Sequence, residues 1–134
     1  MSRRVLVVDD DPVIRRLVRA ALGAGHELSE AASVREARAV FKEESPALVL
    51  LDIFLPDGEG IELIEGFTRG DAKAAVVMLT SSEDIETARR AIERGAAEYL
   101  TKPFDPEDLR RAVRRWLREP GERPQERKPW RRAQ

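Results

Sequence analysis

Residues 47–52, with the sequence Ala-Leu-Val-Leu-Leu-Asp, are an unbroken apolar run that stops at an acid. Two further runs have the same form: residues 5–8 stop at Asp9, and residues 75–79 stop at Thr80. An apolar run without alternation is typical of a strand that is buried on both faces, as in a parallel sheet covered by helices. These three runs therefore predict the centre of an α/β fold.

Segments with helical spacing separate these strands. Pro12 suits a first helical turn, Ser33 opens a capping-box pattern, and Ser82 is expected to cap a helix that Gly95 ends. The first helix carries six apolar residues on one stripe: Val13, Ile14, Leu17, Val18, Ala21 and Leu22. Two weaker strands are expected near residues 28–31 and 98–101. Five strand–helix units of this kind predict a doubly wound parallel sheet with right-handed crossovers.

Length and composition limit the alternatives. The chain has 134 residues, enough for one domain, and 24 basic against 25 acidic residues, so bulk attraction to nucleic acid or to a membrane surface is not expected. It has no cysteine and no long apolar stretch, and we expect a cytoplasmic protein. We predict a domain over residues 1–118. Residues 119–134, with three prolines, five basic and three acidic residues, are interpreted as a tail or linker.

Polar residues end four of the predicted strands. Asp9 and Asp10 follow the first strand, Asp52 ends the third, Thr80 follows the fourth, and Lys102 lies at the end of the fifth. Because the carboxyl ends of parallel strands meet at one edge of a sheet, these side chains are expected to gather in one place. That convergence is the strongest functional signal in the sequence.

The gathered residue types favour magnesium-dependent phosphoryl chemistry. Carboxylates about 4 Å apart repel by roughly 4 kcal/mol per pair at an effective dielectric constant near 20, so the cluster needs a cation or shared protons. Oxygen ligands without His or Cys favour Mg²⁺. Lys102 and Thr80 suit phosphoryl oxygens, and an aspartate such as Asp52 can accept a phosphoryl group as an acyl phosphate.

Four motifs together resemble the receiver domain of bacterial two-component response regulators: VLVVDDDP (5–12), LVLLDIFLPDGEG (48–60), VVMLTSS (76–82) and EYLTKPF (98–104). The resemblance covers about residues 3–118. It implies a flavodoxin-like (βα)5 fold with strand order 2-1-3-4-5. It also implies phosphotransfer to Asp52 from a sensor histidine kinase or a histidine phosphotransfer domain.

The resemblance also implies individual roles. Asp10 and Asp52 would bind Mg²⁺ directly, Asp9 through water, and the main-chain carbonyl of Phe54 would complete the protein ligands. Thr80 and Lys102 would hold the phosphoryl group, and Tyr99 would follow the Thr80 hydroxyl as a switch. The surface of the fourth helix, fifth strand and fifth helix would act on an output domain or partner protein, or form a homodimer upon phosphorylation. The protein would then be a signalling domain rather than an enzyme, apart from supporting its own phosphotransfer and slow dephosphorylation.

Other interpretations remain open from the residues alone. Asp9-Asp10-Asp11 also fits the nucleophile motif of a haloacid-dehalogenase-like phosphatase, in which Asp9 rather than Asp52 would be phosphorylated. A flavodoxin-type binding module is a third possibility, although a phosphate site would avoid so many acids. The Lys102-Pro103 bond is a candidate cis peptide that the sequence does not decide.

Overall fold

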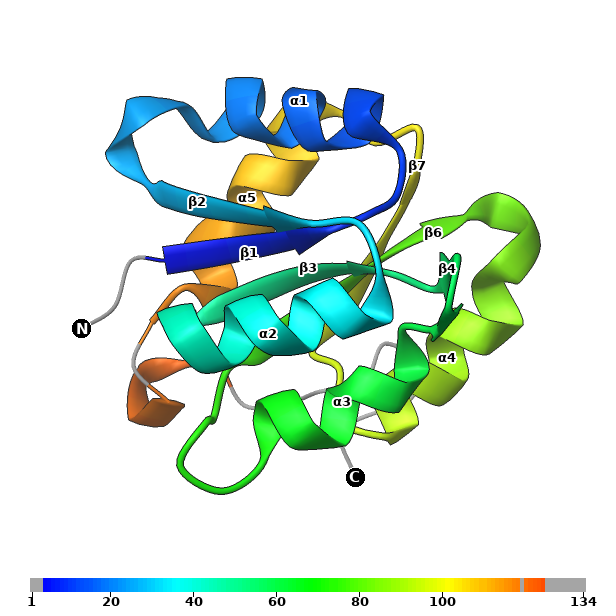
Figure 1. The fold of residues 1–134 in the computed structure, drawn as a ribbon. Coiled ribbons are helices and arrows are strands. Elements are labelled where there is room, and N and C mark those ends of the chain that lie inside the picture. Colours follow the sequence, from blue (N-terminus) through cyan, green and yellow to red (C-terminus); the bar gives the residue numbers. More distant parts are fainter. Residues whose placement is uncertain (1–3, 119, 125–134) are drawn as a thin grey trace, which may run out of the picture.

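The computed structural model describes residues 4–118 and 120–124, and its centre is a five-stranded parallel sheet (Figure 1). The strand order is β2-β1-β3-β6-β7, which is the predicted 2-1-3-4-5 order, because β4 and β5 form a separate small hairpin. The strands are β1 (Arg4–Val8), β2 (Glu27–Ala31), β3 (Leu48–Asp52), β4 (Phe54–Leu55), β5 (Gly58–Glu59), β6 (Ala75–Ser81) and β7 (Glu98–Lys102). The predicted flavodoxin-like fold is confirmed.

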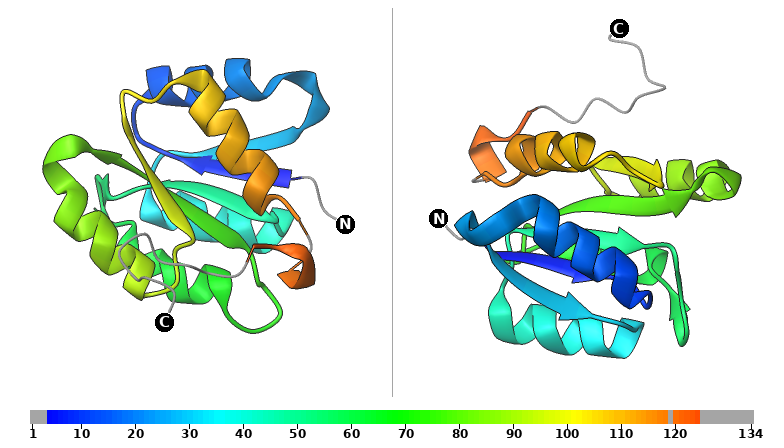
Figure 2. Two further views of the ribbon diagram at one scale, coloured as in Figure 1. Left: turned by 180° about the vertical axis from the view of Figure 1, so that it is seen from behind. Right: turned by 90° about the horizontal axis from the view of Figure 1, so that it is seen from above.

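Helices cover both faces of this sheet, as Figures 1 and 2 show. They are α1 (Pro12–Leu22), α2 (Val34–Glu44), α3 (Ile61–Thr68), α4 (Ile85–Glu93) and α5 (Pro106–Trp116). Side chains of α1 and α5 share one core cluster with Val5 and Val7, whereas α2, α3 and α4 share the other with Leu6 and Val8. Successive residues of β1 thus enter opposite cores, which explains why the strand is apolar throughout.

The first helix buries a narrower stripe than its sequence predicts. Val18 and Leu22 are buried, but Val13 and Leu17 are 52% and 49% exposed. The six apolar residues span more of the helix circumference than the face that packs on the sheet and on α5.

Side chains cap the starts of α1, α2 and α5, whereas α3 and α4 have no side-chain cap. Ser33 accepts a hydrogen bond from the Glu36 amide, as the predicted capping box requires, but the Glu36 carboxylate accepts from the amide of Ala32, one residue before the cap, so only half of that box is present. The prediction for Ser82 was wrong, because residues 82–84 form a 3₁₀ turn and α4 begins only at Ile85. The turn is held by Ser81, whose hydroxyl donates to the Asp84 carboxylate at 2.6 Å.

Residues 120–124, part of the predicted tail, lie against the domain. They include a short 3₁₀ turn, and the Arg123 guanidinium donates to the carbonyls of Arg118 and Ala47. Residues 119 and 125–134, the rest of that segment, lie outside the described residues, so the boundary at 118 stays a prediction. Within the described part of the chain, no helix combines the length and apolarity needed to cross a membrane.

Candidate functional site

An acidic cluster with one lysine lies at the carboxyl edge of the sheet. The β1–β3 register sets Val8 beside Leu51, so Asp9 and Asp10 follow β1 next to the end of β3 at Asp52. One carboxylate oxygen from each of the three aspartates lies within 4.8 Å of the others. From β7, the Lys102 ammonium donates to Asp9 Oδ2 at 2.6 Å and lies 3.5 Å from Asp52 Oδ1. The predicted convergence of these four residues is therefore present.

The Asp9 carboxylate is almost fully buried and fully engaged. Its side chain is 1% exposed, Oδ2 accepts from Lys102, and Oδ1 accepts from the Asp11 amide at 2.9 Å. Asp10, by contrast, is exposed and makes no side-chain hydrogen bond to any described residue. The two neighbouring acids thus differ: the Asp10 carboxylate is open to a ligand, whereas Asp9 is buried and each of its oxygens already accepts a hydrogen bond from the protein.

The electrostatics of Asp52 and Lys102 are strongly coupled. Burial raises the pKa of Asp52 to about 6, the Asp9 charge adds to the rise, and the Lys102 ammonium opposes it. Burial lowers the pKa of Lys102, but the hydrogen bond to Asp9 and the charges of Asp52 and Asp9 outweigh it, so the net shift is upward. At neutral pH Asp52 is therefore mostly ionised, beside the Lys102 ammonium.

Thr80, Tyr99 and Phe54 lie on elements around this cluster. Thr80 is buried near the end of β6, and its hydroxyl faces the carbonyls of Ser81 and Asp84 at 3.2 and 3.5 Å. Tyr99 is half-buried on β7, paired with Met78. Phe54 follows Asp52 by two residues in the β4–β5 hairpin and is 49% exposed. The structure directs the Thr80 hydroxyl toward its own loop, an arrangement that the sequence did not predict.

The donor set of the cluster fits a hard divalent cation. All three candidate ligands are carboxylates, and their combined charge with Lys102 is −2, from three negative charges and one positive. Oxygen ligands of this charge suit Mg²⁺, which keeps several waters and binds through one or two carboxylates. Asp10 and Asp52 offer the accessible oxygens for direct binding.

Comparison with known proteins identifies the family. A model of the response regulator receiver domain matches residues 5–114. The chain belongs to this family. It is 37% identical over 96 residues to a chemotaxis protein CheY of Halobacterium salinarum, covering 71% of this chain and 80% of that protein. The crystal structure of the receiver domain of NtrX from Brucella abortus superimposes with a TM-score of 0.78 at 37% identity, covering 84% of this chain and 97% of that one.

Several relatives of this receiver domain are longer proteins. The response regulator protein PilR of Pseudomonas aeruginosa is 38% identical over 97 residues, which are 71% of this chain but only 22% of PilR. The chain therefore matches only a small part of PilR. The haloacid-dehalogenase alternative has no support, because the family match includes the whole region of all four motifs.

Gly60 is a site residue that the sequence motifs indicated only as part of a loop. A Cβ atom at Gly60 would lie 2.1 Å from the main-chain oxygen of Asp52, and the Gly60 amide donates to the Ile53 carbonyl at 2.6 Å. Only glycine allows the loop to pass so close to the backbone of Asp52. The signal in the sequence is a glycine eight residues after a strand-ending aspartate, but the contact itself needs coordinates.

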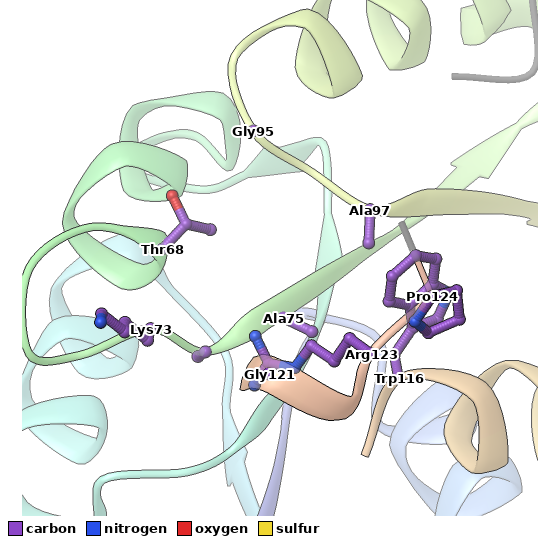
Figure 3. Close-up of a pocket in the computed structure, with 10 residues that line it drawn as sticks. Thr68, Lys73, Ala75, Gly95, Ala97, Trp116, Gly121, Arg123 and Pro124 are labelled. Atoms are coloured by element: carbon purple, nitrogen blue, oxygen red, sulfur yellow. The ribbon is translucent and has the colours of Figure 1, made fainter. Parts of the chain in front are cut away.

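A cavity of about 500 Å³ lies at the opposite, amino edge of the sheet of this receiver domain (Figure 3). Lys73, Ala75 and Ala97 line it near the starts of β6 and β7, together with Trp116 and Arg123. None of the site residues at the carboxyl edge contributes to it. The cavity and the acidic cluster are therefore separate features of the domain.

Proposed function

We propose that this receiver domain accepts a phosphoryl group on Asp52 from a phosphohistidine of a sensor histidine kinase or histidine phosphotransfer domain, in a Mg²⁺-dependent reaction. The observation that carries the proposal is the Lys102 ammonium, which reaches from β7 to both Asp9 and Asp52. An ammonium held between two carboxylates is placed to neutralise a phosphoryl group arriving at Asp52.

The proposed roles follow from what each carboxylate already binds. Asp10 and Asp52 would hold Mg²⁺ directly, joined by the main-chain carbonyl of Phe54. Asp9 would act through water, in keeping with its burial and with the hydrogen bonds that its oxygens accept from Asp11 and Lys102. Bound Mg²⁺ would supply charge neutralisation on the phosphoryl oxygens.

In the proposed transfer, an Asp52 carboxylate oxygen attacks phosphorus and forms an acyl phosphate while the histidine N–P bond breaks. The electron pair of that bond stays on the imidazole of the donor. Lys102 keeps its proton throughout and pairs with the phosphoryl oxygens. Asp52 needs no general base, because with a pKa of about 6 it is mostly ionised at pH 7.

Phosphorylation would then act as a switch at Thr80. Its hydroxyl would leave the carbonyls of Ser81 and Asp84 for a phosphoryl oxygen, and the half-buried Tyr99 ring would follow. The surface of α4, β7 and α5 would carry the change to an output domain, a partner protein or a second copy of the chain. We propose that this signalling, rather than turnover of a substrate, is its role, and that it takes place in the cytoplasm, where ATP-dependent kinases supply phosphoryl groups.

The test is phosphorylation by acetyl phosphate with and without Mg²⁺, with the modified residue mapped by mass spectrometry. We expect an acid-stable, base-labile acyl phosphate on Asp52 that requires Mg²⁺ and is lost in Asp52→Asn. Asp71→Asn, which changes an exposed acid at the other edge of the molecule, is the matched control and should be phosphorylated normally. Modification of Asp9, or none in the wild type, would overturn the proposal.

A further inference from the structure

Arg15, on α1, makes contacts that connect the acidic cluster to a neighbouring strand. Its side chain is only 19% exposed. Nη1 donates to the main-chain oxygen of Asp9 at 2.6 Å, and Nε donates to Glu30 Oε1 at 2.9 Å. The guanidinium therefore donates to two partners at once, the main chain of Asp9 and the Glu30 carboxylate on β2. A lysine ammonium lacks this rigid, forked arrangement of donors.

The contact with the Asp9 carbonyl completes the fixation of that residue. The Asp9 amide donates to the Ala31 carbonyl at 3.0 Å, and its two carboxylate oxygens accept from Asp11 and Lys102. The carbonyl is its remaining polar group, and Arg15 binds it. All four polar groups of Asp9 are thus held by four different partners.

The same contact fixes the start of Asp10. The carbonyl of Asp9 and the amide of Asp10 belong to one planar peptide unit, so a guanidinium on that carbonyl sets the direction in which Asp10 leaves the strand. Asp10 itself is exposed, and its carboxylate has no hydrogen bond within residues 4–118 and 120–124 to hold it. Its position therefore depends on its backbone.

Glu30 keeps the Arg15 guanidinium in place. Its other oxygen accepts from Arg19 Nη2 at 2.6 Å and Nε at 3.2 Å, so the carboxylate joins two arginines of α1 to β2. The hydrogen bond from Arg19, with help from Arg15, lowers the pKa of Glu30 despite the opposing effect of burial. Glu30 therefore remains an ionised acceptor well below neutral pH.

We propose that Arg15 is a positioning residue for Mg²⁺, which orients Asp10 through the Asp9 carbonyl, with Glu30 as its own orienting partner. The proposal rests on the proposed Mg²⁺ site. The direction in which the Mg²⁺ affinity changes is informative, because Arg15 is a cation close to the proposed Mg²⁺ site. Charge repulsion alone would make Mg²⁺ bind more tightly when Arg15 is removed, whereas loss of positioning makes it bind more weakly.

The experiment is an NMR titration of backbone amides of the full chain with MgCl₂, which needs no phosphorylation. Arg15→Met is compared with Arg16→Met. Arg16 lies on the same helix, is exposed, and makes no hydrogen bond or ion pair with any residue that the structure describes, so its replacement removes the same charge without removing a contact. We expect the Kd for Mg²⁺ to rise about tenfold in Arg15→Met, in line with other residues that orient metal ligands. Arg16→Met should bind Mg²⁺ as tightly as the wild type or slightly more tightly.

Two further variants keep the test decisive. Arg15→Lys should show intermediate affinity, and Glu30→Gln, which keeps the guanidinium, should weaken Mg²⁺ binding less than Arg15→Met. Adding Glu30→Gln to Arg15→Met should cause little further loss, because both act through one contact. If Arg15→Met does not fold, the Kd of Glu30→Gln for Mg²⁺ tests the inference on its own.

Unchanged or tighter Mg²⁺ binding in Arg15→Met, even with a lower unfolding midpoint, would show a purely structural role and overturn this inference. The inference also fails if Arg15→Met does not fold and Glu30→Gln binds Mg²⁺ as tightly as the wild type. If the wild type itself binds no Mg²⁺, the proposed function fails instead, so the two failures can be told apart.

Discussion

The two edges of the sheet differ in what they gather. The carboxyl edge brings Asp9, Asp10, Asp52 and Lys102 into a tight, charged cluster. The amino edge has a cavity of about 500 Å³, whose lining includes two cations but no carboxylate. The larger hollow and the charged cluster thus lie at different edges. Chemistry follows the ends of the strands, where side chains of opposite charge are forced together.

The largest expected difference between the edges is in the phosphorylation rate after a lysine is replaced at each of them. Lys102→Met should slow phosphorylation by acetyl phosphate about a hundredfold or more, because it removes the ammonium that faces the developing charge. Lys73→Met removes the same charge at the amino edge and should leave the rate unchanged. Rates are followed by intact-protein mass spectrometry. Equal rates for the two variants would remove the distinction between the edges.

A pair of glycine substitutions sharpens the comparison in terms of stability. Gly60→Ala forces a Cβ to within 2.1 Å of the Asp52 carbonyl oxygen and should cost on the order of 3 kcal/mol. Gly66→Ala, in the interior of α3, meets no atom within 4 Å and should stabilise the protein by about 0.5–1 kcal/mol. Urea unfolding measures both. A Gly60→Ala variant as stable as the wild type would contradict the close approach.

The charge cluster should also show in the dependence of stability on pH. Because the pKa of Asp52 is raised from 3.8 to about 6, the folded state binds its proton more tightly than the unfolded state. The contribution of Asp52 to the free energy of unfolding should therefore rise as pH falls from 7 through about 6 toward 3.8.

Asp52→Asn should be more stable than the wild type at pH 7, by on the order of 2 kcal/mol in Mg²⁺-free buffer, and should lack that rise. Urea midpoints of both proteins between pH 4 and 7 provide the measurement. If the urea midpoints of the two proteins changed with pH in parallel, ionised Asp52 would not destabilise the folded state.

The smallest effect is expected at the amino edge. Trp116→Phe keeps an aromatic ring but loses the hydrogen bond from the indole Nε1 to Glu98 at 2.6 Å. Glu98 keeps Arg115 as a partner, so the cost should be about 1 kcal/mol. Thermal unfolding gives this value, and the phosphorylation rate should not change. A slower phosphorylation would mean that the two edges are coupled.

Much of this arrangement could be predicted from sequence, because backbone periodicity and strand topology determine it. Apolar runs ending at Asp9, Asp52 and Thr80 located three of the strands, and the motif resemblance supplied their order. Side-chain contacts between distant elements were out of reach. Nothing in the spacing of Arg15 and Glu30 indicates that they pair, or that a guanidinium binds the Asp9 carbonyl.

The errors have a physical cause as well. Apolar spacing placed Val13 and Leu17 on the buried stripe of α1, but only packing against the sheet decides where such a stripe ends. Ser82 has the right side chain for a helix cap, yet the hydrogen bond between Ser81 and Asp84 holds a turn before α4. The width of the buried stripe on α1 and the start of α4 both depend on contacts that the local sequence does not specify.

A crystal structure with Mg²⁺ and beryllofluoride, a stable mimic of the phosphoryl group, would show which aspartate accepts the phosphoryl group. We predict beryllofluoride on an Asp52 carboxylate oxygen, Mg²⁺ on Asp10 and Asp52, and Lys102 against a fluoride. The Thr80 hydroxyl should have turned from Ser81 and Asp84 toward another fluoride. Beryllofluoride on Asp9, or an unmodified Asp52 at saturating concentrations, would contradict the account.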